Sequence, residues 1–427
     1  MKIKSIDAHE ILASGGYPTI ESRVTLEDGT VGLSSVPYGA SAGSHEAVVL
    51  TDGNPARWQG KGMLKAVENI VMTIAPGLAG REAEDQRSID GLMIAMDGTD
   101  TKANLGGNAI LAVSTAVANA VANAKKVPLY RHIMNTFQTG VDLTTLPQPM
   151  MVVIEGGKHA HNSTDFQEFC LSGIGSRSVA ENVRITLETY HELANVLKSE
   201  GLSTNVGNEG AFAPAGIASN EKPLEYMVQA IEKAGYKAGE DLGISLDPAA
   251  SEFYLPAQAG VEGKYTLKLE NRVLSAEEMI GYYQVWMDTY PIVTLEDGLA
   301  EDDWENWPKL NQATKAKGIA LLGDDLTVTN PIRLQKAIDM QAISAILIKL
   351  NQIGTLTETI DCCALAAKNG LMTTTSHRGG GETNDTTMVD VAVAVGSRFI
   401  KVGPTRGERV AKYNRLMAIE RELGINS

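Results

Sequence analysis

The sequence predicts an α/β protein in which a small N-terminal α+β domain, residues 1–138, precedes a barrel of alternating strands and helices, residues 143–427. Two observations predict this order. Residues 3–37 alternate apolar and polar side chains between glycines, as short antiparallel strands do, and helical stretches follow them. After residue 143, short apolar runs recur, and each ends in a charged or reactive side chain.

The N-terminal domain is expected to begin with three strands, over residues 3–12, 19–28 and 29–37. The last two strands meet at the turn Glu27-Asp28-Gly29. Residues 108–126 are rich in alanine and apolar on most faces, which predicts a buried helix. Strands followed by helices indicate a compact α+β unit.

The barrel is predicted from the spacing of its strand ends. Most intervals between successive ends are 24 to 28 residues, which suits one strand, one helix and two loops. One interval of 49 residues needs an insertion, and residues 254–272 are expected to form a long loop there. Ser275 and Glu278 then form a capping box at the start of a helix. The strand ends are Asp247, Glu296, Asp324, Lys349, His377 and Lys401.

Charge and cysteine content narrow the class of protein. With 37 basic and 52 acidic residues, the net charge of −15 argues against a nucleic-acid binder or a protein of anionic membranes. A few local cations would still allow an anionic substrate. Three cysteines give no disulfide framework, and the N-terminus has no apolar signal core. A cytoplasmic location is therefore expected.

The first three strand ends carry carboxylates. Because the carboxyl ends of barrel strands converge on one face, these acids predict a hard oxygen site for Mg²⁺ or Mn²⁺. The alternative for any single acid is a helix cap or a solvent contact. Lys349 ends an apolar strand, where burial and nearby cations would lower its pKa toward that of a general base. A structural salt bridge is the alternative for this lysine.

Three further segments carry candidate groups. His159, Gln167 and Glu168 follow one apolar run, and Glu209 lies in a glycine-rich turn where it is equally well explained as a turn residue. Arg378 precedes three glycines, which suits a phosphate or carboxylate anion. The small residues of PYGASAGSHEA, from Pro37 to Ala47, fit a moving lid or an ordinary loop equally well.

Nine motifs, in order and across nearly all of the chain, together resemble the enolase family. They are PYGASAGSHEA, EGGKHAHNSTDFQEF, VGNEGAFAP, DPAASEF, PIVTLEDGLAEDDW, LLGDDLTVTNP, AILIKLNQIGTLTET, SHRGGGETNDTT and ERVAKYNRL. The resemblance implies an enolase-type (TIM-like) barrel with a ββαα start and a homodimer or homo-octamer. It also implies reversible dehydration of 2-phosphoglycerate to phosphoenolpyruvate, with two Mg²⁺ ions in each active site.

The resemblance also implies a role for each matching position. Lys349 resembles the base that takes the C2 proton, and Glu209 resembles the acid that protonates the departing hydroxyl, assisted by Glu168. Arg378 resembles the phosphate clamp. The expected metal ligands are Asp247, Glu296, Asp324 and, for the second ion, Ser41, and the expected substrate-orienting residues are His159, Gln167, His377 and Lys401.

The sequence departs from the family pattern in several segments near the expected site. Gly379-Gly380-Gly381-Glu382 replaces Ser-Gly-Glu, and Asn208 replaces an aspartate beside Glu209. Glu155 replaces an asparagine, and Ala13-Ser14-Gly15-Gly16-Tyr17-Pro18 replaces Asp-Ser-Arg-Gly-Asn-Pro. In the lid, Tyr38 and Ala42 replace a serine and a threonine.

These departures leave three functional hypotheses. The first is 2-phosphoglycerate hydro-lyase. The second is related enolpyruvyl chemistry on a phosphonate substrate, as in carboxyphosphonoenolpyruvate synthase. The third, a non-catalytic binding protein, conflicts with the retention of Lys349, Glu209 and the acids.

Overall fold

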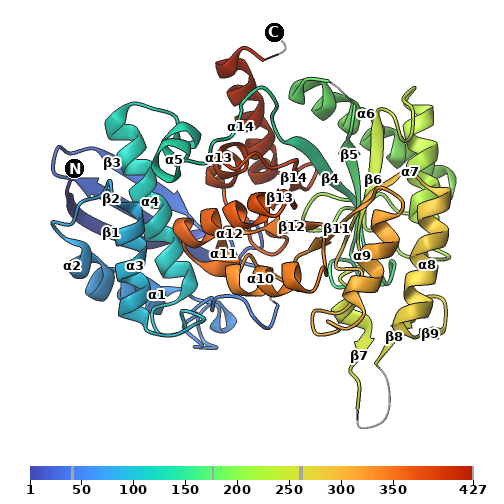
Figure 1. Ribbon diagram of the computed structural model, residues 1–427, viewed down its shortest axis with the longest axis horizontal. Coiled ribbons are helices and arrows are strands. Elements are labelled where there is room, and N and C mark those ends of the chain that lie inside the picture. Colours follow the sequence, from blue (N-terminus) through green and yellow to red (C-terminus); the bar gives the residue numbers. More distant parts are fainter. Residues whose placement is uncertain (40–42, 176, 259–262, 426–427) are drawn as a thin grey trace.

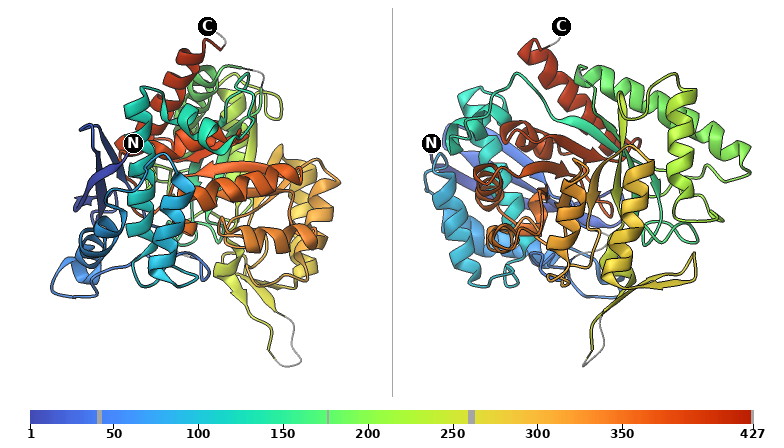
Figure 2. Two further views of the ribbon diagram at one scale, coloured as in Figure 1. Left: turned by 60° about the vertical axis from the view of Figure 1, so that its left-hand side comes forward. Right: turned by 45° about the vertical axis from the view of Figure 1, so that its right-hand side comes forward.

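The computed structural model describes residues 1–425 apart from 40–42, 176 and 259–262. A small sheet with its helices lies against a closed eight-stranded barrel (Figure 1). The turned views in Figure 2 show that the N-terminal sheet and helices keep to one side of the barrel. The predicted class, an α+β unit followed by a βα barrel, is confirmed.

The N-terminal sheet is antiparallel in the order β1-β2-β3, which confirms the three predicted strands. Strand β2 buries Ile20, Val24 and Leu26, which share one face because side chains alternate along a strand. The predicted buried helix is α4 (Gly107–Lys125), and it packs on β2 and β3. The other elements of this region are β1 (Ile3–Leu12), β2 (Pro18–Leu26), β3 (Val31–Ser35), α1 (Leu64–Asn69), α2 (Ala75–Leu78), α3 (Gln86–Asp97) and α5 (Leu129–Phe137).

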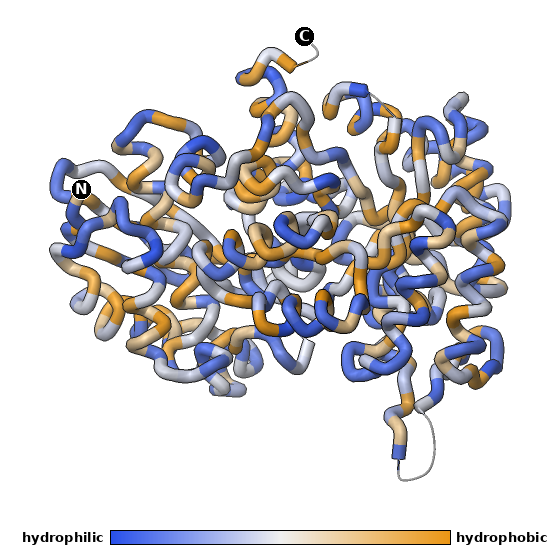
Figure 3. The backbone as a smooth tube through the Cα atoms, in the orientation of Figure 1, coloured by the Kyte–Doolittle hydropathy of each residue, from blue (hydrophilic) through white to orange (hydrophobic). Residues whose placement is uncertain are grey.

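The barrel closes in the order β10-β11-β12-β13-β14-β4-β5-β6. Strand β5 runs antiparallel to both of its neighbours, whereas the other pairs are parallel. The strands of the barrel are buried and most are apolar runs, and hydrophobic colour lies along several of them in Figure 3. They are β4 (Gln148–Glu155), β5 (Glu168–Gly173), β6 (Leu242–Asp247), β10 (Ile292–Glu296), β11 (Ala320–Gly323), β12 (Ala345–Ile348), β13 (Met372–Ser376) and β14 (Phe399–Val402). Strand β13 is the exception to the apolar runs, because it consists of one methionine, three threonines and one serine.

Helices cover the outside of the barrel. Strands β4 and β5 are followed by two helices, so the ββαα start implied by the resemblance is present. The predicted capping box of Ser275 and Glu278 opens α8. No helix in the described part of the chain has the length and apolar character needed to cross a bilayer. The helices are α6 (Val179–Ser199), α7 (Lys222–Lys233), α8 (Ala276–Thr289), α9 (Trp307–Lys315), α10 (Pro331–Asp339), α11 (Leu350–Ile353), α12 (Leu356–Lys368), α13 (Thr387–Ala394) and α14 (Gly407–Leu423).

The prediction of a long loop over residues 254–272 is wrong in part. This insertion forms a three-stranded sheet of β7 (Tyr254–Leu255), β8 (Lys264–Leu267) and β9 (Arg272–Leu274), which projects from the barrel in Figure 1. Tyr265 on β8 is fully buried, and its hydroxyl donates to Asp303. Leu267 and Leu274 are buried as well, so these strands are held by packing although they are too short to show periodicity in the sequence.

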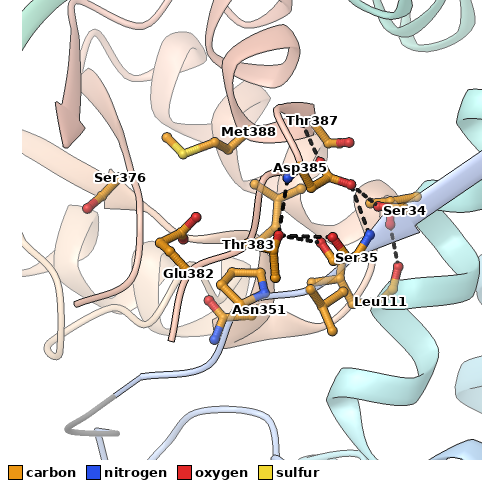
Figure 4. Close-up of a pocket in the computed structure, with 14 residues that line it drawn as sticks. Ser34, Ser35, Leu111, Asn351, Ser376, Glu382, Thr383, Asp385, Thr387 and Met388 are labelled. Atoms are coloured by element: carbon orange, nitrogen blue, oxygen red, sulfur yellow. Dashed lines mark hydrogen bonds between the residues drawn. The ribbon is translucent and has the colours of Figure 1, made fainter. Parts of the chain in front are cut away.

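Polar contacts join the N-terminal sheet to the barrel beside the C-terminal rim. Asp385 accepts hydrogen bonds from the Ser34 hydroxyl (2.8 Å) and the Ser35 amide (2.9 Å), and Ser35 also bonds to Thr383 (Figure 4). Glu382 lies in the same segment as Thr383 and Asp385, and its carboxylate accepts a hydrogen bond from the Arg378 amide. The N-terminal domain therefore contacts the barrel next to the loop that carries Arg378.

Candidate active site

The barrel topology brings the predicted reactive residues to one rim. Asp247 and Glu296 end their strands, whereas Asp324, Lys349 and His377 directly follow theirs, and Lys401 lies in β14. Strand β5 runs the other way, so its first residue, Glu168, reaches the same rim and pairs with Asp247 in register. Strand ends on this face of a βα barrel form the usual active-site position.

One buried cavity at this rim collects nearly all the candidates. Glu296 is absent from the lining, but its carboxylate contacts Lys401, which lines the cavity. Ser41 and the replaced lid residue Ala42 lie outside the described residues. The predicted residues that line the cavity are His159, Gln167, Glu168, Glu209, Asp247, Asp324, Lys349, His377, Arg378 and Lys401.

Two lysines hold the carboxylates of this cavity together. Lys401 Nζ lies 3.0 Å from Asp247 Oδ2, 2.7 and 2.8 Å from the oxygens of Glu296, and 2.7 Å from Glu168 Oε2. Lys349 Nζ forms an ion pair with Asp324. The ammonium of Lys401 thus lies where two predicted metal ligands converge, which shows that the pocket accommodates positive charge.

The expected lowering of the Lys349 pKa is not found in this structure. Burial lowers the pKa of Lys349, but the carboxylates of Asp324 and Glu296 raise it more, and the net shift is upward. The expectation assumed metal ions beside this lysine, and their positive charge would oppose the effect of these carboxylates.

The donor set of the carboxylate cluster fits a divalent cation. Asp247, Glu296 and Asp324 are each at most 6% exposed and offer only oxygen, the ligand that Mg²⁺ prefers. Burial and repulsion from Asp247 raise the pKa of Glu296 well above its usual range, so added positive charge would relieve the cluster. Ligand atoms of Asp297, Asp324 and Asp325 also lie within 4.8 Å of one another.

In the group formed by Asp297, Asp324 and Asp325, Asp297 binds backbone amides. Its two oxygens accept hydrogen bonds from the backbone amides of Asp324 (2.9 Å) and Asp325 (2.8 Å). We therefore favour Asp247, Glu296 and Asp324 as the metal-binding set, with Asp297 orienting the loop after β11. Sequence analysis missed Asp297, although the consecutive acids Glu296-Asp297 and Asp324-Asp325 were a signal.

Glu209 lies between two histidines. It belongs to a loop whose Phe212 forms backbone hydrogen bonds with the last residues of β4. Its oxygens are 3.6 Å from His159 Nδ1 and 3.3 Å from His377 Nε2. Burial lowers the pKa of His159, but Glu168 and Glu209 raise it to about 9, whereas burial keeps the pKa of His377 low. Burial and Glu168 raise the pKa of Glu209, yet the histidines turn the net shift downward.

Glu155, identified in the sequence only as a departure from the family pattern, belongs to the same cluster. It ends β4, is completely buried, and pairs in register with Glu168. Burial and the charge of Glu209 raise its pKa to about 8. The cluster therefore keeps a protonated carboxyl beside Glu209 at neutral pH.

Arg378 reaches the cavity from the loop after β13. Its guanidinium donates to both oxygens of Glu46, at 2.9 and 3.1 Å, and both side chains are buried. Glu46 was not predicted; it lies in the PYGASAGSHEA segment, 332 residues away in sequence. The next residue, Gly379, is needed for space, because a Cβ there would lie 2.3 Å from Glu209 Oε1.

Two models of known domain families match this chain. The family described as "Enolase, N-terminal domain" matches residues 3–133, and the one described as "Enolase, C-terminal TIM barrel domain" matches residues 143–427. Together they span the whole two-part fold and the rim that carries the acids and lysines. The chain therefore belongs to the enolase family.

Proposed function

We propose that this chain is a Mg²⁺-dependent hydro-lyase that reversibly dehydrates 2-phosphoglycerate to phosphoenolpyruvate. The observation that carries the proposal is the presence of Lys349 and Glu209 in one buried cavity with the carboxylate cluster and Arg378. Lys349 follows β12, whereas Glu168, which would assist Glu209 and contacts the same His159, starts β5 across the eight-stranded barrel from β12. A base and an acid thus approach the same small molecule from different sides.

The proposed chemistry assigns one proton transfer to each side. Lys349 removes the proton from C2, and the electron pair forms the C2–C3 double bond while the C3 hydroxyl leaves. Glu209 would donate the proton that makes this hydroxyl leave as water. Because the net pKa shift of Glu209 is downward, Glu209 would first take this proton from Glu155, whose pKa is raised to about 8. In the reverse direction, the same groups exchange these roles.

Other residues of the cavity would bind and orient the anionic substrate. Arg378 lines the cavity, and its guanidinium, which is paired with Glu46 here, would supply positive charge to the phosphate. Lys401 and His159 add positive charge beside the carboxylates. Asp247, Glu296 and Asp324 would hold Mg²⁺, which when bound supplies the positive charge that stabilises a deprotonated carboxylate substrate.

A coupled absorbance assay tests the proposal by following phosphoenolpyruvate formed from 2-phosphoglycerate with Mg²⁺. In D₂O, the wild-type chain should also incorporate deuterium at C2, and Lys349→Ala should abolish this exchange. Glu209→Gln should keep the exchange and lose the dehydration. Exchange that persists in Lys349→Ala would remove that lysine from its role.

A second candidate is the same proton abstraction on a phosphonate analogue. It is favoured by the altered loop Gly379 to Gly381 and by Tyr38, which contacts this loop through a pair of backbone hydrogen bonds. Exchange at C2 of 2-phosphoglycerate without net dehydration would favour this candidate.

The assembly and location of the protein are part of the same proposal. Family membership favours a homodimer or homo-octamer, and the three cysteines are free and buried, which suits a reducing cytoplasm. Light scattering coupled to size-exclusion chromatography measures the oligomer, and a monomer at working concentration would contradict it.

A further inference from the structure

A cavity of about 380 Å³ lies directly beside the candidate active site. The two spaces share Gly39 and Glu46 as wall residues. Elsewhere, residues that are adjacent in sequence line different spaces. Glu209 and Gly379 line the active site, whereas Asn208 and Gly380 line the cavity. The wall between the two spaces is therefore a single layer of chain.

The segments that depart from the enolase pattern build much of this cavity. Six of its twelve described lining residues come from those segments: Gly15, Tyr17, Pro18, Tyr38, Asn208 and Gly380. They are distant in sequence, so their meeting at one place is a property of the fold. Departures that are scattered along the chain thus change one region of the molecule.

Close packing makes these departures depend on one another. Tyr38 exchanges two backbone hydrogen bonds with Gly381, of 3.0 and 2.9 Å, and a Cβ at position 381 would lie 2.2 Å from the tyrosine ring. A Cβ at Gly15 would lie 2.6 Å from the carbonyl oxygen of Gly380. Gly15 and Gly381 therefore leave the space that the Tyr38 ring and the backbone of Gly380 occupy in this wall.

The charge of the cavity favours an anion. Lys61 Nζ lies 4.2 Å from the centre of the Tyr17 ring, and its side chain is exposed to solvent. The other charged residue among the described lining is Glu46, and Arg378 already neutralises its carboxylate. Asn208 offers a neutral amide where the family pattern has an aspartate.

The rest of the described lining is mostly apolar or aromatic. A cation above an aromatic ring, with apolar surface around it, suits an anionic group on a short apolar or aromatic stem. The apolar and aromatic lining residues are Tyr17, Pro18, Tyr38, Val49 and Met63.

We propose that this cavity is a second ligand subsite, which binds an anionic group on a short apolar or aromatic stem next to the reacting phospho-acid. This inference rests on the proposed function in one respect only, the identity of the ligand in the neighbouring active site. The group belongs either to a separate small molecule or to an extension of the substrate itself, and both sources share this chemistry.

Calorimetric titration of the Mg²⁺-loaded full-length protein with phenylphosphonate tests the subsite. Lys61→Gln should weaken binding by up to about five-fold, the effect of losing one screened charge contact. Lys65→Gln, at an exposed lysine of α1 that does not line the cavity, is the matched control and should bind as wild type does. Equal affinity of wild type and Lys61→Gln would overturn the proposal.

Repeating the titration with saturating 2-phosphoglycerate distinguishes the two sources. Binding that depends on Lys61 and survives 2-phosphoglycerate supports a separate molecule, whereas binding that depends on Lys61 but is displaced supports one longer substrate. Displacement without dependence on Lys61 places the probe in the active site and overturns the subsite. Because calorimetry needs no turnover, absent dehydration would count against the proposed function alone.

Discussion

Replacing Glu155 with glutamine should stabilise the protein in a pH-dependent way. Glu155 is completely buried, and neither carboxyl oxygen has a hydrogen-bond partner among the described residues. Burial, followed by repulsion from Glu209, raises its pKa from 4.5 to about 8. Glutamine has the same shape and carries no charge at any pH in this range.

The size of the effect follows from the pKa difference. An acid whose pKa is raised by folding stabilises the fold fully below its unfolded pKa, and this contribution is lost as pH rises toward the folded pKa. Between pH 4.5 and pH 7 the loss for Glu155 is roughly 3–4 kcal/mol, at about 1.4 kcal/mol for each pH unit. Glutamine at this position avoids that loss.

Thermal unfolding at several pH values measures this difference. For 427 residues, the entropy of unfolding near Tm is about 0.9 kcal/mol/K, so Glu155→Gln should raise Tm by about 4 °C at pH 7 and about 1 °C at pH 5. Glu200→Gln, at an exposed position, should leave Tm unchanged at both pH values. A shift for Glu155→Gln that is equal at pH 5 and pH 7, or negative, would refute the argument.

Three further predictions concern the cavity itself. Glu46→Gln removes the carboxylate of a buried ion pair with Arg378 and should cost roughly 3 kcal/mol of unfolding free energy, measured by denaturant titration; an unchanged midpoint would contradict this. Gly379→Ser places a side-chain atom against Glu209, so it should lower the free energy of unfolding by about 1–3 kcal/mol and also lower kcat. Wild-type values of both quantities would show that the loop moves to accommodate the serine. Chelation with EDTA should abolish C2 exchange and Mg²⁺ should restore it, whereas full activity in EDTA would exclude the metal role.

The strand ends were predictable because local pattern and topology agree. Each apolar run that ends in Asp247, Asp324 or Lys349 is a buried strand, and a βα barrel brings all such ends to one rim. Spacing alone was sufficient to place these residues together. No detail of side-chain packing was needed.

Contacts between distant segments were not predictable in the same way. Glu46 pairs with Arg378 across 332 residues, and nothing near Glu46 in the sequence indicates its partner. Glu155 looks like one more residue at the end of an apolar run, because its elevated pKa comes from burial in the folded barrel and from the charge of Glu209 on another segment. The pKa of Lys349 is hard to predict for a related reason: burial lowers it, Asp324 raises it, and the balance depends on the charge of the groups that surround the lysine.

The charges of the rim explain why cation and anion binding should be linked here. Four carboxylates, those of Glu168, Asp247, Glu296 and Asp324, contact the ammonium groups of Lys349 and Lys401, and Glu168 also contacts His159, whose pKa is raised to about 9. With all of these groups ionised the formal sum is −1, so an anionic phospho-acid approaching this side of the cavity is repelled unless further positive charge is present. A divalent cation supplies the charge that this sum lacks. Substrate affinity should therefore fall when Mg²⁺ is withdrawn, before any effect on the chemical step is considered.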